Sequence, residues 1–253
     1  MATNLYFRGQ GRLYLASRDV AGNPGPLSWV GNVSALSLTL ETETLEHRES
    51  YTGQRGTDLK LVTGKTARMS ATLESFDLDN LALGLYGAKV AVTGTTVTGE
   101  TLPTGLAVGD IVQTAHPKIS SVVVKDSAGS PATLVAGTHY SVDDATFGRI
   151  QILSLGSFTQ PFKVDYTYAA RKDVGMFTAA APERWFTFHG LNTANGNTGV
   201  IVDLFRVALD PLSELALIGD EVAGYELRGE VLLDSTKSSA GALGQYARIR
   251  DLA

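Results

Sequence analysis

The sequence contains no cysteine among its 253 residues, which removes several functions at once. Without thiols there is no disulfide framework, no thiolate metal cage and no cysteine nucleophile. The sequence also lacks any run of roughly 20 apolar residues, the length needed to span a bilayer. Its first residues lack the basic and apolar parts of a signal peptide. We therefore expect a protein that folds in a reducing cytoplasm, with no membrane span and no cleaved signal.

The chain also has fewer basic than acidic residues. The chain has 21 Lys and Arg against 26 Asp and Glu, which gives a formal net charge of −5 and a pI near 5.4. Proteins that grip nucleic acid phosphates carry the opposite balance, so we expect no specific nucleic acid binding. Apolar residues at 43% and charged residues at 19% are ordinary for a soluble chain, and the length predicts one large domain or two smaller ones.

Alternation of apolar and polar residues with period 2 is the main structural signal, and it predicts a mainly β fold. It is clearest from Tyr225 to Leu233. Segments 36–40 and 67–73 repeat the pattern, and we predict that they form one long antiparallel pair. Two further strands are expected at 184–189 and 200–209, separated by an Asn- and Gly-rich turn.

Two short helices are predicted from their end signals. The first runs from Leu78 to Tyr86, with Asp77 as N-cap and Gly87 as the left-handed stop. The second runs from Pro211 to Gly219, with proline at its preferred first helical position. Neither is long enough to be stable without packing on a sheet.

A segment of different character, residues 93–176, interrupts the pattern. It begins with a Thr- and Gly-rich stretch and contains short strand candidates, each bounded by its own turn residues. These candidates are residues 122–124, 140–142, 149–153 and 162–168. We predict a core domain formed by 1–92 and 177–253, with a small β domain, 93–176, inserted at a surface loop.

Several motifs suggest chemistry but are incomplete. Gly64-Lys65-Thr66 resembles the end of a phosphate-binding loop, yet Leu59 stands where such a loop needs glycine, so we expect a turn between two strands there. Asp143 and Asp144 are expected to stabilise a turn rather than to hold a metal. The histidines lack the close helical spacing of zinc sites; they are His47, His116, His139 and His189.

Aromatic residues beside arginine at 6–8 and 184–186 have the composition of base-stacking platforms. Both fit the period of a sheet core, and basic residues do not gather into a patch, so core packing is favoured for both segments. The run from Glu41 to Gly56 is the most informative. It predicts a strand that continues out of the core into a charged loop, longer than a tight hairpin needs. A mobile hairpin tip and an interface are equally good interpretations of this loop.

The order of elements resembles that of the major tail tube protein of long-tailed, non-contractile bacteriophages. The resemblance covers residues 11–86 and 183–234. It rests on the charged hairpin and on the segments GRLYLAS, LESFDLDNLALGLYG, RWFTFHGLNT, VIVDLFRVALDP and GYELRGEVLLDS.

That resemblance implies a β-sandwich or barrel core with one or two short helices, and a structural virion protein rather than an enzyme. Subunits of that family form hexameric rings that stack into a tube, the conduit for genomic DNA ejection, without a cofactor or metal. DNA would pass through the lumen without specific binding, and no membrane would be contacted. Other implied partners are the tape measure, tail terminator and distal tail proteins. The implied location is the virion tail, assembled in the host cytoplasm.

The hairpin is implied to contact the neighbouring ring. The candidate interface residues are Thr44, Leu45, Glu46, His47, Arg48, Glu49, Tyr51, Gln54 and Arg55. The N-terminal residues through Arg12 and the tail after Ser235 are further candidates, and the segment 93–176 is expected on the outer surface. Two alternatives stay open: a carbohydrate-binding or adhesin-like β-sandwich module, and a tube protein of a contractile secretion system. A hydrolase is disfavoured because nucleophile and metal patterns are missing.

Overall fold

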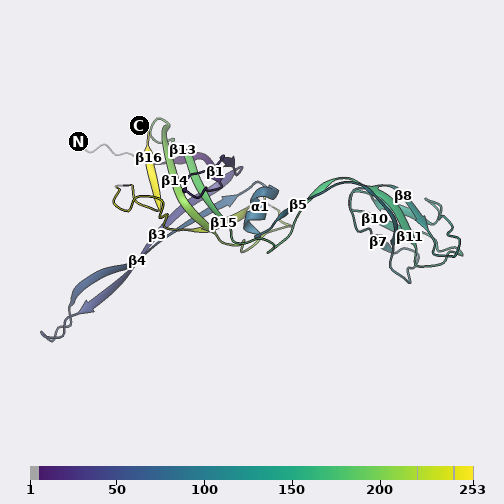
Figure 1. Ribbon diagram of the computed structural model, residues 1–253, viewed down its shortest axis with the longest axis horizontal. Helices are drawn as coiled ribbons and strands as arrows, with labels where there is room; N and C mark the ends of the chain where they lie inside the picture. The colour runs from purple at the N-terminus through teal and green to yellow at the C-terminus, as the bar shows by residue number, and fades with distance from the viewer. Residues whose placement is uncertain (1–5, 221, 242, 253) are drawn as a thin grey trace. The chain divides into compact units, whose positions relative to one another are not determined.

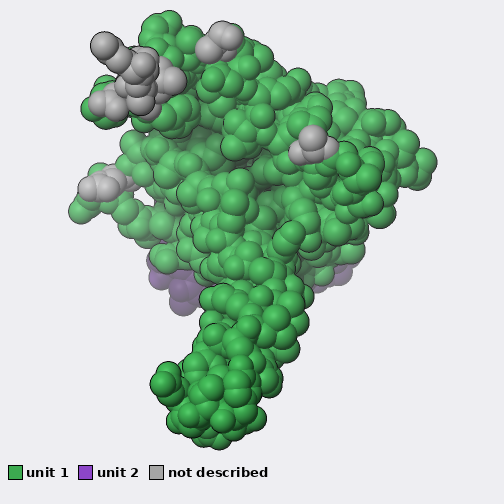
Figure 2. All heavy atoms as spheres, turned by 90° about the vertical axis from the view of Figure 1, so that its left-hand side faces the viewer, with its two compact units in different colours: residues 1–89, 174–253 green, residues 90–173 purple. Residues whose placement is uncertain are grey.

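The computed structural model describes residues 6–220, 222–241 and 243–252. It divides into two compact units, unit 1 with residues 1–89 and 174–253 and unit 2 with residues 90–173 (Figure 2). Strands dominate in both, and one short helix is present among the described residues, so the predicted mainly β fold is confirmed (Figure 1). Unit 2 occupies nearly the same part of the chain as the inserted domain expected at 93–176.

Unit 1 is built on one large antiparallel sheet with the strand order β2-β1-β13-β14-β15-β4-β3, and β16 also pairs with β14. Its elements are β1 (Gly9–Ala16), β2 (Ser28–Trp29), β3 (Val33–Arg48), β4 (Thr57–Leu73), α1 (Leu78–Gly84), β13 (Glu183–Asn192), β14 (Thr198–Leu209), β15 (Tyr225–Val231) and β16 (Ala247–Asp251).

Alternation of side chains explains the central strands. In β15 every second residue from Tyr225 to Val231 is buried, as the sequence predicted, although the strand ends before Leu233. Gly229 occupies one of these inward positions. A larger residue would clash there, because a Cβ would come within 2.6 Å of the carbonyl oxygen of Ala208. The predicted pairing of 36–40 with 67–73 is also confirmed, and β3 and β4 stay paired as far as Arg48 and Thr57, with register shifts near Val33, Glu43 and His47.

Helix α1 packs against the core of this sheet and begins as predicted. The Asp77 carboxylate accepts a hydrogen bond from the Asp79 amide at 3.1 Å. Its end differs from the prediction, because Tyr86 rather than Gly87 adopts the left-handed conformation, with φ of 49°. Gly87 is needed for close packing instead, since a Cβ there would lie 2.2 Å from the carbonyl oxygen of Gly175.

The core of unit 1 gathers buried side chains from β1, β4, β13, β14, β15 and α1, together with Val30, which follows β2. They are Leu13, Val30, Ala67, Met69, Ala71, Leu73, Leu81, Phe186, Leu204, Val207, Leu209, Tyr225, Leu227 and Val231.

The second predicted helix, from Pro211 to Gly219, is wrong: the segment is irregular. Its backbone forms a hydrogen bond outside the segment instead: the Leu212 amide donates to the carbonyl of Gly84 at 2.8 Å. A helix of this length is marginal in isolation and does not outweigh such contacts. Ile218 in this segment is 97% exposed.

One turn prediction around β3 and β4 is wrong. Residues 64–66 lie inside β4, not in a turn, because β3 pairs with this part of the strand, for example Thr42 with Lys65. The predicted continuation of the strand out of the core is confirmed: β3 runs to Arg48, and the loop between the strands, 49–56, is longer than a tight hairpin needs. Cross-strand hydrogen bonding therefore continues beyond the core.

Unit 2 contains two three-stranded antiparallel sheets, β7-β10-β9 and β6-β11-β8. Their strands are β6 (Thr96–Thr101), β7 (Ile111–Gln113), β8 (Ile119–Lys125), β9 (Tyr140–Asp144), β10 (Arg149–Ile152) and β11 (Lys163–Tyr168). They surround a separate core that includes Val124, Ile150, Phe162 and Tyr166, all almost fully buried. Two further strands, β5 (Lys89–Val92) and β12 (Arg171–Val174), pair with each other at the boundary between the units.

Candidate functional site: a projecting arm and an apolar groove

The most unusual feature of unit 1 is a two-stranded ribbon that extends beyond the sheet. Strand β15 last pairs with β4 at Val231 and Ala67, whereas β3 and β4 stay paired as far as Arg48 and Thr57. Residues 41–66, called the arm below, therefore leave the body of unit 1 as a bare hairpin (Figures 1 and 2). Isolated two-stranded hairpins are marginally stable in water, and no third strand of the described chain pairs with the arm.

The turn at the arm's end is organised by one carboxylate. Glu49 accepts hydrogen bonds from the amides of Tyr51 and Thr52, both at 2.8 Å, and from the Thr52 hydroxyl. Its own amide donates to the carbonyl of Gly56 at 2.9 Å, which closes the turn. The Thr52 hydroxyl and these amides lower the pKa of Glu49 to about 2. The carboxylate is therefore ionised at any physiological pH, and the turn is ordered.

The arm has two chemically different faces. Directly paired residues on an antiparallel ladder share a face, as do residues two apart on one strand. Leu45 pairs with Leu61, and His47 with Leu59, so three leucines gather on one side, called the leucine face below. Leu45 is 58% exposed and Leu61 46%.

The opposite face of the arm is mainly polar and charged, and among the described residues its one exposed large apolar side chain is Val62, which pairs with Thr44. Glu46 pairs with Lys60, and their side chains form an ion pair at 3.0 Å. Thr42 pairs with Lys65 on this same face. Exposed ion pairs contribute little to stability, and this face can stay in water. Exposure of the leucine face to water is unfavourable, because burial of its apolar surface would lower the free energy.

The predicted interface residues all lie on this arm, in two settings. Thr44 to Arg48 belong to β3, and the other four lie in the turn: Glu49, Tyr51, Gln54 and Arg55. Sequence reasoning missed the contribution of β4, above all Leu59 and Leu61. The signal was present in the alternation of Asp58, Leu59, Lys60 and Leu61, to which no strand was assigned.

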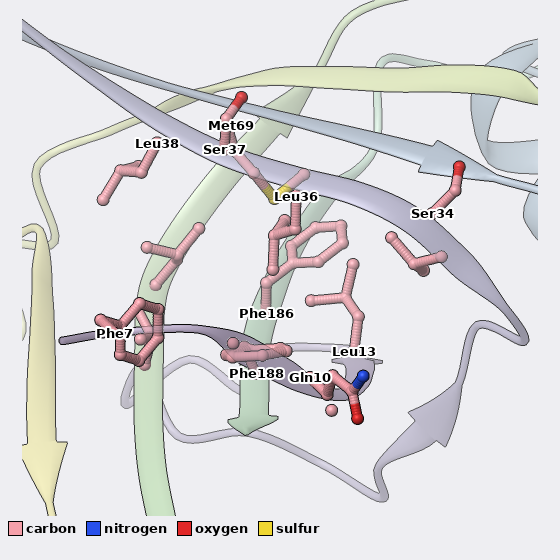
Figure 3. Close-up of a pocket in the computed structure, with 15 residues that line it drawn as sticks. Phe7, Gln10, Leu13, Ser34, Leu36, Ser37, Leu38, Met69, Phe186 and Phe188 are labelled. Carbon is pink, nitrogen blue, oxygen red and sulfur yellow. The ribbon is translucent and has the colours of Figure 1, made fainter. Parts of the chain in front are cut away.

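A groove of 390 Å³ opens on the core side of the same sheet (Figure 3). Strands from near both ends of the sheet line it, since β1 and β3 face each other across it with β4, β13 and β14 beneath. Its walls are mainly apolar. The lining residues are Phe7, Gly9, Gln10, Gly11, Leu13, Val33, Ser34, Leu36, Ser37, Leu38, Met69, Phe186, Phe188, Val202 and Leu204.

Glycines make the groove possible. A Cβ on Gly190 would lie 2.3 Å from the Cε1 atom of Phe188, and a Cβ on Gly11 would lie 2.8 Å from the same ring. The ring of Phe188 can therefore lie against the backbone of β1 and β13 at the groove. Both glycines have a steric rather than a conformational role, because neither has a positive φ.

The prediction of core packing is confirmed for one aromatic segment and wrong for the other. Trp185 and Phe186 are both buried, which confirms core packing for 184–186. Core packing is wrong for 6–8, because Tyr6 is 71% and Phe7 65% exposed, and Phe7 stands at the groove instead. The expected interface role of the N-terminal residues through Arg12 falls partly on 1–5, and that of the tail partly on 242 and 253, all outside the described residues.

The histidines lie in separate environments. Each has a local contact: His47 Nδ1 with Asp58 at 2.6 Å, His116 stacked on Tyr168, His139 bonded to the Val135 amide, and His189 against Tyr14. Within residues 6–220, 222–241 and 243–252, no three His, Asp or Glu side chains are grouped to hold a metal ion. None of the helical residues described forms a segment long and apolar enough to cross a membrane.

The carboxylates of Asp143 and Asp144 stabilise the turn between β9 and β10, as predicted. Asp144 accepts from the Thr146 amide at 2.8 Å, and Arg149 forms ion pairs with both carboxylates. The two acidic residues are therefore satisfied within unit 2.

Comparison with known proteins adds a family but no function. No curated protein matches the chain. A family model described as "Protein of unknown function UCP028589" matches residues 6–250, which is nearly the entire length. The chain therefore belongs to the UCP028589 family of proteins of unknown function.

Proposed function

We propose that the chain is a structural subunit that polymerises, as stacked hexameric rings, into the tail tube of a long-tailed non-contractile bacteriophage. The observation that carries this proposal is the arm, residues 41–66, whose leucine face is exposed on a bare hairpin. In a monomer the exposed leucines add nothing to stability. In a polymer they stabilise the contact between copies, because each copy's arm meets the next copy and buries its leucines there.

The expected gain is substantial. Full burial of a leucine side chain is worth about 1.5–3 kcal/mol. Leu45, Leu59 and Leu61 are about half exposed, so each can contribute about 1 kcal/mol when covered. Repeated around a ring, these contributions stabilise stacking while each individual contact stays weak. Identical copies in head-to-tail contact form a ring or a tube according to whether the rotation closes.

The charge distribution supports passage of DNA rather than its binding. The net charge is −5, and cations on the polar side of β4 and β15 are matched by carboxylates. Arg68 lies 3.6 Å from both Asp210 and Glu230, and Arg228 pairs with Glu226. A wall of this kind offers phosphates no free cation. In this proposal the subunit meets tape measure, terminator and distal tail proteins in the virion, and unit 2 decorates the outside.

Removal of the arm tests the proposal. Leu40 and Ala67 are directly paired, so replacing residues 41–66 by Asn-Gly closes β3 and β4 with a two-residue turn and leaves the core intact. Negative-stain electron microscopy of concentrated wild-type protein should show rings or tubes of uniform diameter. The shortened variant should give folded monomers with the circular dichroism spectrum of a β protein. Polymers that form equally well without the arm would contradict the proposal.

The groove favours a second candidate, a carbohydrate-binding or adhesin-like module. Its volume lies within the range of about 300–1,000 Å³ typical of ligand sites. Its described polar side chains are only Gln10, Ser34 and Ser37, few for a sugar. A soluble sugar that raises the unfolding temperature of a persistently monomeric wild type would favour this module. A tube protein of a contractile secretion system would also form rings, but its tubes would need a sheath to function.

A further inference from the structure

We infer that the groove of one copy receives the leucine face of another copy's arm. This inference rests on the proposed function and names the surface that the arm contacts. The occupant is a second copy rather than the arm's own chain, because β3 lines the groove from Val33 to Leu38 and then carries the arm away from it (Figures 1 and 2).

The first argument is chemical fit. Among the described residues that line the groove, none is charged, and the walls are aromatic and aliphatic. Leu36 and Leu38 on one wall are each 37% exposed, as is expected of side chains that face an empty apolar space. Leu45, Leu59 and Leu61 are apolar side chains of the size that such a space accepts. Docking would cover the exposed apolar surface of both partners at once.

The second argument is reach. The strand from Glu41 to Arg48 has eight residues, which at about 3.3 Å each gives roughly 26 Å. That length brings Leu45 and Leu61, which lie midway along the arm, well clear of their own sheet. The ordered turn around Glu49 holds the two strands together, so the leucines are presented as a fixed pair.

The third argument is complementary charge. Glu41 and Glu43 share the leucine face, since they alternate with Leu45 along β3. Neither forms an ion pair among the described residues, and the arm's Lys60 and Lys65 lie on the other face. Arg8 lies between the groove residues Phe7 and Gly9 and has no carboxylate within 4.0 Å in the described part of the chain. Arg12 is not available, because its guanidinium lies over the Trp29 ring on the other face of β1. One carboxylate of the arm would thus meet Arg8 on docking.

The absence of native cysteine allows a direct test by disulfide trapping. One variant carries Leu45→Cys on the arm, and a second, purified separately, carries Ser34→Cys in the groove. The matched control is Thr39→Cys, which lies on the same strand as Ser34, is also exposed, and does not line the groove. A disulfide needs Cα atoms about 4.4–6.8 Å apart, so only neighbouring sites are trapped.

Mixing the variants under mild oxidation should give the mixed disulfide of Leu45→Cys with Ser34→Cys, and little with Thr39→Cys. Thr39→Cys trapping equal to that of Ser34→Cys would overturn the inference. Polymers that form without the Ser34 disulfide would overturn the docking alone and leave the proposed function standing. Absence of both polymer and disulfide would contradict the two together.

Charge reversal gives an independent readout that does not depend on oxidation. Arg8→Glu should raise the protein concentration needed for assembly about fivefold to tenfold, the effect of one exposed charge pair turned repulsive. Adding Glu43→Arg to the same chain should restore assembly, because the pair is then reversed. Unfolding temperatures of the single and double variants, compared with wild type, report whether each still folds. Failure of the double variant to recover, with folding intact, would contradict the assigned pairing.

Discussion

Replacement of Asp203 by Asn should specifically weaken unit 1. Asp203 lies in the middle of β14 with its side chain 4% exposed. It accepts hydrogen bonds at 2.7 Å from the Arg248 Nε, the Arg250 guanidinium and the Thr187 hydroxyl. Both arginines belong to β16, so one carboxylate ties the last strand to the sheet. Asn keeps the shape of the side chain but leaves two arginines without their anion.

The size of the effect follows from burial. Removal of one partner from a buried ion pair typically costs about 3–5 kcal/mol. The two arginines are 32% and 42% exposed and can turn towards water, so we expect a smaller loss, about 2 kcal/mol. For a unit of this size each kcal/mol lowers the unfolding temperature by about 2–4 °C. The variant should therefore unfold about 4–8 °C earlier.

The pH dependence has a definite sign. Burial raises the pKa of Asp203, but hydrogen bonds from Arg248 and Thr187 and the charges of the arginines outweigh it and hold the pKa below its ordinary value. A lowered pKa contributes stability above the unfolded value of about 3.9 and loses it as pH falls through the folded value. The difference between wild type and Asp203→Asn should be constant from about pH 6 to 8 and shrink below about pH 4.

Differential scanning calorimetry can measure this change. The two units have separate cores, so two transitions are expected, and only that of unit 1 should shift. Glu226→Gln is the matched control, because it removes a carboxylate from an exposed pair with Arg228 and should cost less than about 1 kcal/mol. Equal shifts for both variants, or a shift in the transition of unit 2, would refute the reasoning.

Three further predictions concern the groove, the turn and unit 2. Gly190→Ala should displace the Phe188 ring and cost about 1–3 kcal/mol, seen as a lower urea midpoint, and an unchanged midpoint would contradict the steric role of this glycine. Glu49→Gln should speed hydrogen exchange at the Tyr51 and Thr52 amides, whereas in wild type this protection should be constant from about pH 4 to 8 because the pKa of Glu49 is about 2. A fragment of residues 90–173 should fold alone with a cooperative thermal transition, and a featureless melt would show that its core depends on unit 1.

The strands of this fold could be predicted where one face is buried and the other is exposed to solvent. β15 and the β3–β4 pairing were recognised because each strand alternates strictly over the core. The helix predicted from Pro211 failed for the opposite reason: its end signals are local, while a long-range bond from Leu212 to Gly84 decided its conformation.

The position of the arm could be predicted from the sequence, but its structure could not. Charge and length marked the region, and the strand was expected to continue out of the core, but the sequence did not show that it runs as far as Arg48. Hydrogen bonding between β3 and β4 tolerates solvent on both faces, so hydrophobic alternation is a poor guide to where such a ribbon stops. The groove was not predictable, because it depends on the approach of β1 to β3 and on Phe188 lying over two glycines.

The pairing of β5 with β12 has a practical consequence. The chain leaves unit 1 and returns to it on adjacent antiparallel strands, so the two attachment points are neighbours. An exchange of residues 93–170 for a foreign domain with closely spaced ends would then preserve the ladder that joins both ends. Residues 93–170 are thus a suitable place to insert a cargo such as an enzyme or an epitope.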